Sequence, residues 1–375
     1  MSMRTVEQAP GGAPTKARLR ITTRNTASAA LLALALGVAA CAPVSAPREA
    51  AGAISCAAGS LRGQGSSAQT NAVNTWIRNY QVACPDATVA YESTGSGAGV
   101  RAFLAGTGGF AGTDSALTAP QQAAADARCG RGPAVHLPMV IGPIALAYNV
   151  AGVGGLRLAP ATAARIFAGA VTRWDDPVIA ADNPGVVLPS TAIRTVHRND
   201  SSGTTANFTA FLAATAGADW RFGEQSTWPA PSGDAQRGSN GVASTIARTD
   251  GAIGYIEASY ARFHDLAVAR IRNGAGEFVA LTDAAAGRTI AAAGLAGTGG
   301  DLRLAVDYRS RADGAYPIVL VTYEVVCRTG TPPLLKSFLT YTAGTEGQAA
   351  AARLGYAPLP EQLRTKVAAA VAALT

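Results

Sequence analysis

The 375-residue sequence is poor in charge, because only 15% of its residues are Asp, Glu, Lys or Arg. A disordered chain would carry more charge, and the 48% hydrophobic content indicates packed globular structure instead. The net charge of +7 is concentrated near the N-terminus, where residues 1–40 hold five basic residues and one acidic, which leaves +3 for residues 41–375. The main part of the chain therefore favours no nucleic-acid partner.

Long hydrophobic runs are also missing. The longest apolar run after the N-terminal part, Pro138 to Val150, is interrupted by Gly142 and Pro143 and is typical of a buried strand. The run from Ala27 to Ala40 has fourteen residues, whereas a membrane-spanning helix needs about 20. Basic residues precede this run, as they do in a secretory signal.

The N-terminal apolar run ends in Val38-Ala39-Ala40-Cys41, which resembles the lipobox of bacterial lipoproteins, where cleavage leaves a lipid-bearing cysteine. We therefore expect residues 1–40 to be a lipoprotein signal peptide and Cys41 to carry the lipid; the alternative is an ordinary signal with an incidental cysteine. Residues 41–55 are rich in Ala, Pro and Ser, a composition that predicts a flexible tether.

Patterns for metal binding and catalysis are scarce as well. The three histidines, His136, His197 and His264, show no metal-ligand spacing, and no serine stands in G-x-S-x-G. We expect no metal, no cofactor and no enzyme activity. Ser202, His197 and Asp200 are close in sequence, so an extracellular hydrolase is the alternative from another class.

Four cysteines follow Cys41, an even number in a chain with an export signal, and they predict two disulfides. A zinc site is the alternative, but the close C-x₂-C spacing of structural zinc sites is missing. The four are Cys56, Cys84, Cys129 and Cys327.

Strands, Gly/Ser turns and amphipathic helices alternate between residues 56 and 270, a pattern that predicts an α/β fold with a parallel sheet. The apolar, β-branched segment from Tyr316 to Val326 predicts a central strand, and the chain after it is helical.

Three turns with the same chemistry stand directly before predicted helices: Gly65 to Ser67, Gly95 to Gly97 and Ser201 to Thr204. Free backbone N–H groups and the positive end of the helix dipole favour an anion at such a position, and hydroxyl groups add donors. Ordinary helix capping is the alternative for each turn. The agreement of all three predicts one shared anion site.

Two charged residues refine this hypothesis. Arg198 ends a predicted strand just before the third turn, where its guanidinium suits an oxyanion; the alternative is an exposed surface arginine. Asp114 would repel a fully deprotonated ligand but would accept a hydrogen bond from one that keeps a proton, which favours phosphate over sulfate. The alternative for Asp114 is a helix N-cap before Ala116.

Several stretches resemble the solute-binding protein of the phosphate ABC importer, the PstS family, in the same order and spacing over essentially all of residues 57–375. The cysteines are most similar to those of its mycobacterial lipoprotein members. The matching stretches are GSSAQ (65–69), GSGAG (95–99), GTDSAL (112–117), IFAGAVTRWDDPVI (166–179), DNPGVVLP (182–189), HRNDSSGTTANF (197–208), GSNGVAS (238–244) and DGAIGYIE (250–257).

The resemblance implies binding of inorganic phosphate and delivery to an ABC permease, with another oxyanion such as sulfate or molybdate as the alternative ligand. It also implies that Asp200 orients Arg198. The implied phosphate contacts come from Ser67, the backbone N–H of Ala68, Ser96, Asp114, Arg198, Ser202, Gly203 and Thr204.

The resemblance further implies a two-lobed periplasmic-binding-protein-like α/β fold of type II, with a two-segment hinge. Lobe 1 would comprise residues 56–142 and 310–375, and lobe 2 residues 143–309. In that fold the cysteines would pair as Cys56–Cys84 and Cys129–Cys327, both in lobe 1. We expect a monomer, exported and lipid-anchored at the outer face of the cell membrane.

Overall fold

The computed structural model describes residues 54–375, which belong to one compact unit, Ala50–Thr375. The expected signal peptide, Cys41 and most of the expected tether lie outside the described residues. Ile54, at the end of that tether, packs against the hydrophobic core that includes Trp76 and Tyr80. Among residues 54–375, no helix is both long and apolar enough to cross a membrane.

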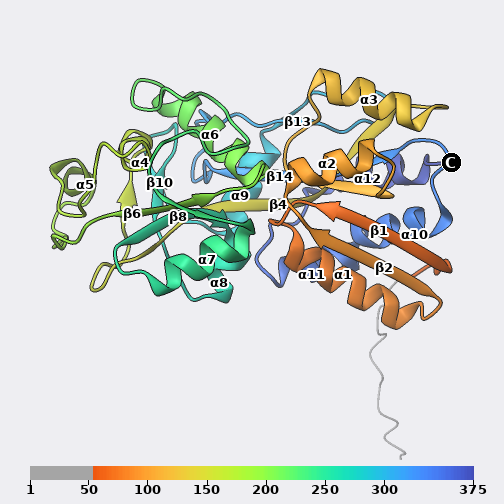
Figure 1. The fold of residues 1–375 in the computed structure, drawn as a ribbon, viewed down its shortest axis with the longest axis horizontal. Helices are drawn as coiled ribbons and strands as arrows, with labels where there is room; N and C mark the ends of the chain where they lie inside the picture. Colours follow the sequence, from red (N-terminus) through yellow and green to blue (C-terminus); the bar gives the residue numbers. More distant parts are fainter. Residues whose placement is uncertain (1–53) are drawn as a thin grey trace, which may run out of the picture. The chain divides into compact units, whose positions relative to one another are not determined.

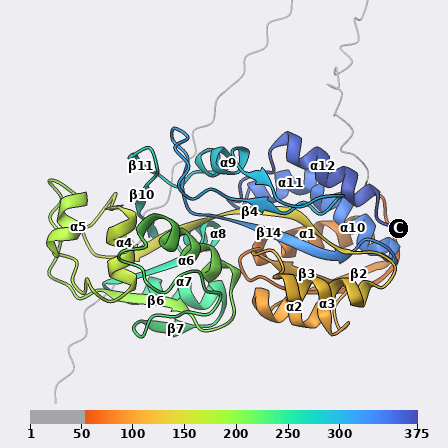
Figure 2. The same cartoon turned by 90° about the horizontal axis from the view of Figure 1, so that it is seen from above.

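A nine-stranded sheet runs through the described unit in the order β2-β1-β3-β14-β4-β8-β6-β7, and β9 pairs with β4 (Figures 1 and 2). Small sheets of β5, β10 and β11 and of β12 and β13 complete the strands. The bounds are β1 (Gly59–Gly65), β2 (Ala87–Ser93), β3 (Phe110–Thr113), β4 (Ala134–Asn149), β5 (Arg157–Leu158), β6 (Arg194–Arg198), β7 (Asp234–Gln236), β8 (Ala252–Glu257), β9 (Ala267–Val268), β10 (Arg270–Arg272), β11 (Phe278–Val279), β12 (Gly294–Leu295), β13 (Leu304–Ala305) and β14 (Val319–Cys327).

The large sheet is mixed, which corrects the expectation of a parallel sheet. Strands β1, β2 and β3 are parallel to one another, and so are β6, β7 and β8. The central strands β14 and β4 pair antiparallel with each other and with their neighbours β3 and β8. The repeated strand, turn and helix pattern indicates parallel pairs locally, but it contains no information on the direction of strands that are distant in sequence.

The longest strand, β4, joins the two halves of the sheet. Its residues up to Pro143 pair with β14, and those from Ile144 onward pair with β8. All of its residues except Asn149 are buried, as expected for the apolar run. Proline has no N–H to donate, and Pro143 stands where the partner strand changes. We call the half with β1, β2 and β3 lobe 1 and the half with β6, β7 and β8 lobe 2.

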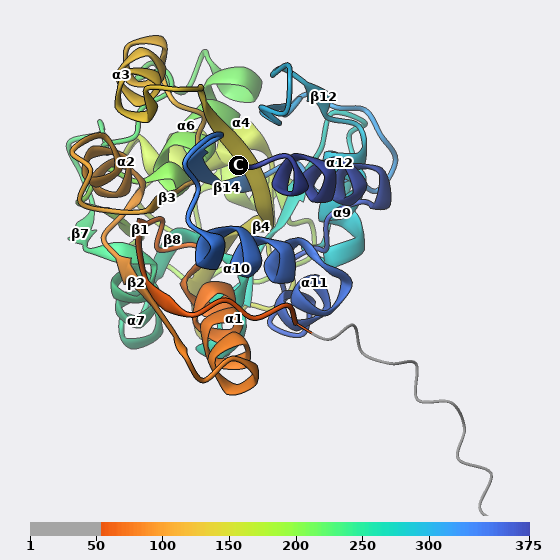
Figure 3. The ribbon, with the colours of Figure 1, turned by 90° about the vertical axis from the view of Figure 1, so that its right-hand side faces the viewer.

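Helices cover both faces of the sheet in lobe 1. Figure 3 shows α1, α10, α11 and α12 on one side of β14 and β4, with α2 and α3 on the other. The helices are α1 (Thr70–Ala83), α2 (Ser96–Leu104), α3 (Ala119–Cys129), α4 (Pro160–Phe167), α5 (Pro177–Asp182), α6 (Gly203–Ala216), α7 (Gly238–Arg248), α8 (Ala258–Phe263), α9 (Asp283–Ala291), α10 (Pro333–Ala343), α11 (Thr345–Ala352) and α12 (Glu361–Ala372).

Apolar side chains at helical spacing determine which faces are buried. In α1, Ala72, Val73, Trp76 and Tyr80 are buried and belong to the large core of lobe 1. A separate core in lobe 2 includes Trp174, Phe208 and Tyr255 and lies around α4 and α6. The two lobes therefore have their own hydrophobic cores, although Ala286 and Ile290 of α9 pack on the core of lobe 1.

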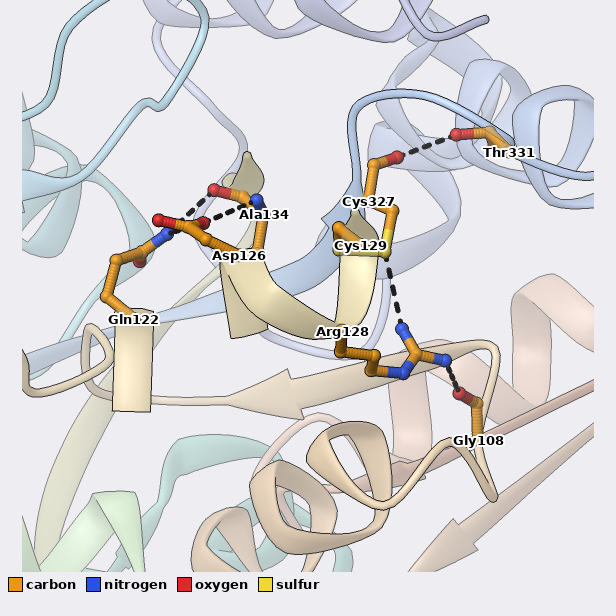
Figure 4. Close-up of a disulfide and its surroundings, with 8 residues drawn as sticks. All are labelled: Gly108, Gln122, Asp126, Arg128, Cys129, Ala134, Cys327 and Thr331. Atoms are coloured by element: carbon orange, nitrogen blue, oxygen red, sulfur yellow. Dashed lines mark hydrogen bonds between the residues drawn. A yellow bond between two sulfur atoms is a disulfide. The ribbon is translucent and has the colours of Figure 1, made fainter. Parts of the chain in front are cut away.

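Both disulfides form with the implied pairing. Cys56 bonds Cys84 with a Cα–Cα distance of 5.4 Å, and Cys129 bonds Cys327 with 5.3 Å. The second bridge joins the end of α3 to the end of β14, and Arg128 lies against it (Figure 4). The Arg128 guanidinium donates to Cys327 Sγ at 3.4 Å and to the Gly108 carbonyl at 2.9 Å.

We expect the Cys129→Ser, Cys327→Ser double variant to lose about 5 kcal/mol of unfolding free energy, because the bridge closes a long loop of the unfolded chain. The two bridges span 198 and 28 residues, so the Cys56→Ser, Cys84→Ser variant is a matched control with an expected loss about 2 kcal/mol smaller. Urea unfolding monitored by circular dichroism measures both. Equal losses would contradict the loop-closure explanation.

Candidate anion-binding site

Five loops meet where the two lobes face each other. In lobe 1 they follow the carboxyl ends of β1, β2 and β3, and in lobe 2 they follow β6 and β7. Figure 1 shows the arrowheads of β1 and β2 pointing toward the middle of the described unit. The turns at 65–67, 95–97 and 201–204 all belong to this group of loops. The structure therefore brings together the three turns that the sequence singled out.

Asp114 lies at the centre of these loops and is 3% exposed. Its Oδ2 accepts from Ser96 Oγ at 3.3 Å, and its Oδ1 accepts from Thr322 Oγ1 at 2.6 Å. The Gly203 N–H, from lobe 2, donates to the same Ser96 Oγ at 3.2 Å. Burial raises the pKa of Asp114, while hydrogen bonds from Ser66, Thr322 and Ser96 and the charge of Arg198 act in the opposite direction.

The helix-cap explanation of Asp114 is wrong. No helix begins at Ala116; α3 begins at Ala119, and Thr118 caps it in a capping box with Gln121. The carboxylate of Asp114 is instead held by hydroxyl groups in the interior, where burying it carries a cost in free energy. Such a placement indicates a role at the site.

Arg198, at the end of β6, is only 2% exposed, so the alternative of a surface arginine is also wrong. Its guanidinium donates to both carboxylate oxygens of Asp200, at 2.7 Å and 2.5 Å. Burial opposes ionisation of Asp200, but the hydrogen bonds and charge of Arg198 outweigh it and lower the pKa of Asp200. This two-point contact fixes the plane of the guanidinium, as the resemblance implied.

Comparison with known proteins gives the family of the chain. A family model described as "PBP superfamily domain" matches residues 50–346. "Phosphate-binding protein PstS 3" of Mycobacterium tuberculosis (strain ATCC 25618 / H37Rv) is 40% identical over 323 residues, 84% of this chain and 86% of the relative. The chain belongs to the PstS family. A second relative, "Phosphate-binding protein PstS 2" of the same strain, is 40% identical over 326 residues, 84% of this chain and 87% of its own.

Solved structures show the PstS-family fold. A high-affinity periplasmic phosphate-binding protein, PfluDING, bound with phosphate, has a TM-score of 0.67 at 22% identity and covers 83% of this chain and 93% of its own. The phosphate-binding protein from Stenotrophomonas maltophilia has a TM-score of 0.66 at 21% identity, with 83% and 94% covered. The fold is thus the two-lobed type II binding-protein fold, as expected.

The other residues that the resemblance implied as phosphate contacts lie at the same group of loops. Two of them, Ser67 and Ala68, form hydrogen bonds to protein groups here. Ser67 Oγ accepts from the Ser239 N–H at 3.0 Å and hydrogen-bonds Ser239 Oγ at 2.9 Å. The Ala68 N–H donates to Ser66 Oγ at 3.1 Å. These are contacts within the protein, and they hold the first turn in place.

In the first turn of α6, one hydroxyl group caps the helix and another has no hydrogen-bond partner. Ser202 Oγ accepts from the Thr205 N–H at 3.2 Å, so the capping alternative holds for this side chain. Thr204 Oγ1 is buried and has no hydrogen-bond partner within residues 54–375. Buried hydroxyl groups are normally satisfied, so this atom is an unused donor and acceptor in the turn that lies against Asp114 and Ser96.

Some site residues were not found from the sequence. Ser239 was overlooked, although Gly238-Ser239 begins α7 and repeats the turn chemistry of the other three helices. Ser66 belongs to the first turn but was not chosen as a contact. Thr322 lies 208 residues from Asp114 on β14, and no local pattern links the two. Proximity in space is the only signal that identifies it.

A cavity of about 430 Å³ borders the site on one side. Residues of both lobes line it, and several of them carry hydroxyl groups. Its lining includes Ser96, Gly97, Thr113, Ser202, Gly203 and Ser226.

The hydrolase alternative finds no support in the contacts of its three residues. Ser202 caps α6, the His197 ring stacks on Trp228 with centroids 5.1 Å apart, and Asp200 binds Arg198. His197 Nδ1 contacts the Arg198 carbonyl at 3.0 Å rather than a serine hydroxyl. Within residues 54–375, no group of three or more His, Cys, Asp or Glu side chains is arranged to hold a metal ion.

We expect Gly203→Ala to weaken ligand binding by about 1–3 kcal/mol, because close-packed sites tolerate added volume poorly. A Cβ at Gly203 would lie 2.4 Å from Asp114 Cβ and 2.8 Å from Ser96 Oγ, both in the opposite lobe. Gly287→Ala in α9 is the matched control, since its Cβ would meet no atom within 4 Å. Calorimetric titration with phosphate measures both; equal affinities for the two variants would refute close contact of the lobes at Gly203.

Proposed function

We propose that this chain binds inorganic phosphate between its two lobes and delivers it to a membrane ABC permease for import. The observation that carries the proposal is that two residues of opposite charge, Asp114 and Arg198, are both buried where the lobes meet. Hydroxyl groups and helix N-termini surround them. The names of the relatives support the same ligand.

The two charged groups would recognise different parts of the ligand. Arg198, oriented by Asp200, would donate to phosphate oxygens together with Thr204 Oγ1 and the N–H groups at the start of α6. Asp114 has only acceptor atoms when ionised, so it would accept a hydrogen bond from the protonated oxygen of hydrogen phosphate. Sulfate and molybdate dianions have no such proton, and Asp114 would repel them.

Contacts between the lobes would couple binding to closure. Ser67 of lobe 1 bonds Ser239 of lobe 2, and Ser96 of lobe 1 bonds Gly203 of lobe 2, so the loops lie close together in this structure. Phosphate held by both sides would favour this closed arrangement. We infer that the hinge separates lobe 1, residues 56–142 and 310–375, from lobe 2, residues 143–309.

Isothermal titration calorimetry of the domain from residue 54 onward, with phosphate, sulfate and molybdate in parallel, tests the function. We expect phosphate to bind tightly and the other two anions weakly. Phosphate binding no tighter than sulfate binding would refute the proposal. Tight binding of molybdate alone would favour the alternative oxyanion.

We further infer that the chain is exported and lipid-anchored through Cys41, and that it acts as a monomer. Two disulfides support export, since such bridges persist in oxidising compartments. Expressing the full chain with Cys41→Ser and separating membranes from soluble protein tests the anchor. If the variant and the unaltered chain partition alike, Cys41 is not the anchor.

A further inference from the structure

A polar cluster of Gln69, Tyr91 and Glu324 lies next to Asp114, and Gln69 and Glu324 are buried. Glu324 of β14 is paired with Gly112 of β3, and directly opposite residues of antiparallel strands face the same side of the sheet. A Cβ at Gly112 would lie 2.2 Å from Gln69 Nε2 and 2.4 Å from Tyr91 Oη. The glycine therefore leaves room for the Gln69 amide and the Tyr91 phenol on the face where Glu324 also lies.

Two acceptor atoms of this cluster have no hydrogen-bond donor. Gln69 Nε2 donates to Tyr91 Oη at 3.0 Å, and Tyr91 Oη donates to the Ser66 carbonyl at 2.9 Å. Gln69 Oε1 and Glu324 Oε2 are both buried, and neither has a hydrogen-bond partner among residues 54–375. Two acceptors cannot satisfy each other, but one proton on the carboxyl group converts Glu324 Oε2 into a donor.

We propose that Glu324 is held as a neutral carboxylic acid that donates to Gln69 Oε1, and that its proton keeps a second negative charge away from Asp114. Glu324 is then a positioning residue of the phosphate site, so this inference rests on the proposed function. Its hydrogen bond supports the first turn through Gln69, which directly follows Ala68. Its neutrality leaves Asp114 as the one acceptor for the ligand's proton.

The groups around Glu324 determine how this arrangement responds to pH. Tyr91 of β2 and Asp114 at the end of β3 lie near it, and Leu137 of β4 is directly opposite it. Two groups of lobe 2 act on these neighbours: Arg198 on Asp114 and Tyr260 on Tyr91. Burial raises the pKa of Glu324 to about 8; a hydrogen bond with Gln69 acts in the opposite direction, and the nearby charge of Asp114 acts in the same direction as burial. Burial raises the pKa of Tyr91 well above its ordinary value, so this phenol stays neutral at moderately alkaline pH.

The charge of Glu324 determines in which direction phosphate affinity changes with pH. Below a pH of about 8 Glu324 is neutral and can donate a hydrogen bond to Gln69 Oε1. Above that pH it is a second carboxylate near Asp114 and has no proton to donate to Gln69. Inorganic phosphate is mainly a dianion across this range, so the change in binding comes from the protein. If only the neutral form binds well, phosphate affinity should fall about tenfold or more between pH of about 7.5 and about 9.5.

The test measures phosphate affinity at these two pH values for the unaltered chain, Glu324→Gln and Glu257→Gln. Glutamine keeps a donor for Gln69 Oε1 and cannot ionise, so Glu324→Gln should abolish the fall. Glu257 is the matched control, because it is equally buried, burial also raises its pKa to about 8, and its carboxylate hydrogen-bonds Ser259 rather than this cluster. Glu257→Gln should therefore keep the fall.

A fall that persists in Glu324→Gln, or that is missing in the unaltered chain, would overturn the inference. Infrared spectroscopy gives a readout independent of phosphate: the carbonyl band of a buried carboxylic acid at neutral pH should weaken in Glu324→Gln. If no variant binds phosphate, the proposed function fails and the infrared band alone decides the state of Glu324. A spectrum unchanged by Glu324→Gln would show that Glu324 is ionised.

Discussion

Replacing Arg198 with alanine should weaken phosphate binding by about 2–5 kcal/mol, or about 30-fold to several thousand-fold. Arg198 is 2% exposed, and its guanidinium is held in one plane by Asp200. Removing it would leave a desolvated anion without its cation and would leave Asp200 unpaired in a partly buried position. Calorimetric titration with phosphate measures the loss.

Two further variants separate binding from folding. Arg194→Ala removes an exposed arginine from the other end of β6, and its phosphate affinity should be that of the unaltered chain. Arg198→Lys keeps the charge but loses the two-point contact with Asp200, so its affinity should be intermediate. Circular dichroism shows whether each variant is folded. If a folded Arg198→Ala variant binds phosphate within about threefold of the unaltered affinity, Arg198 does not contact the ligand.

Replacing Asp114 with asparagine should remove most of the discrimination between phosphate and sulfate. A site built to pair with one polar group of its ligand can reject an analogue without that group by a factor on the order of 10⁴. The carboxylate of Asp114 would accept a hydrogen bond from the protonated phosphate oxygen, which sulfate does not have, whereas an asparagine amide can donate to a sulfate oxygen. Parallel titrations with the two anions measure the ratio of affinities.

Asp86→Asn is the control for this experiment, because Asp86 is exposed in the turn between α1 and β2. Its ratio of phosphate to sulfate affinity should equal that of the unaltered chain. Equal affinity of the unaltered chain for both anions would show that Asp114 does not select the ligand. Discrimination that survives in Asp114→Asn would assign the selection to other groups.

Sequence reasoning placed the three Gly/Ser turns correctly, because their chemistry is local. A Gly/Ser turn before a helix determines by itself that N–H groups and hydroxyls are presented at the helix N-terminus, and the turns at 65–67, 95–97 and 201–204 lie together as predicted. The disulfide pairing was also correct, since it follows from strand order in the resembled fold. The assignment of contact residues such as Ser67 and Thr204 stays a prediction.

Only the tertiary structure decided the features that join distant segments. The hydroxyl of Thr322 on Asp114 and the pairing of Ser67 with Ser239 connect residues far apart in sequence. Glu324 appears as the one charged residue in a mostly apolar strand, and its proposed partner Gln69 lies far earlier in the chain. Local patterns report backbone geometry and burial, but hydrogen-bond partners across a sheet depend on register, which the packed chain alone determines.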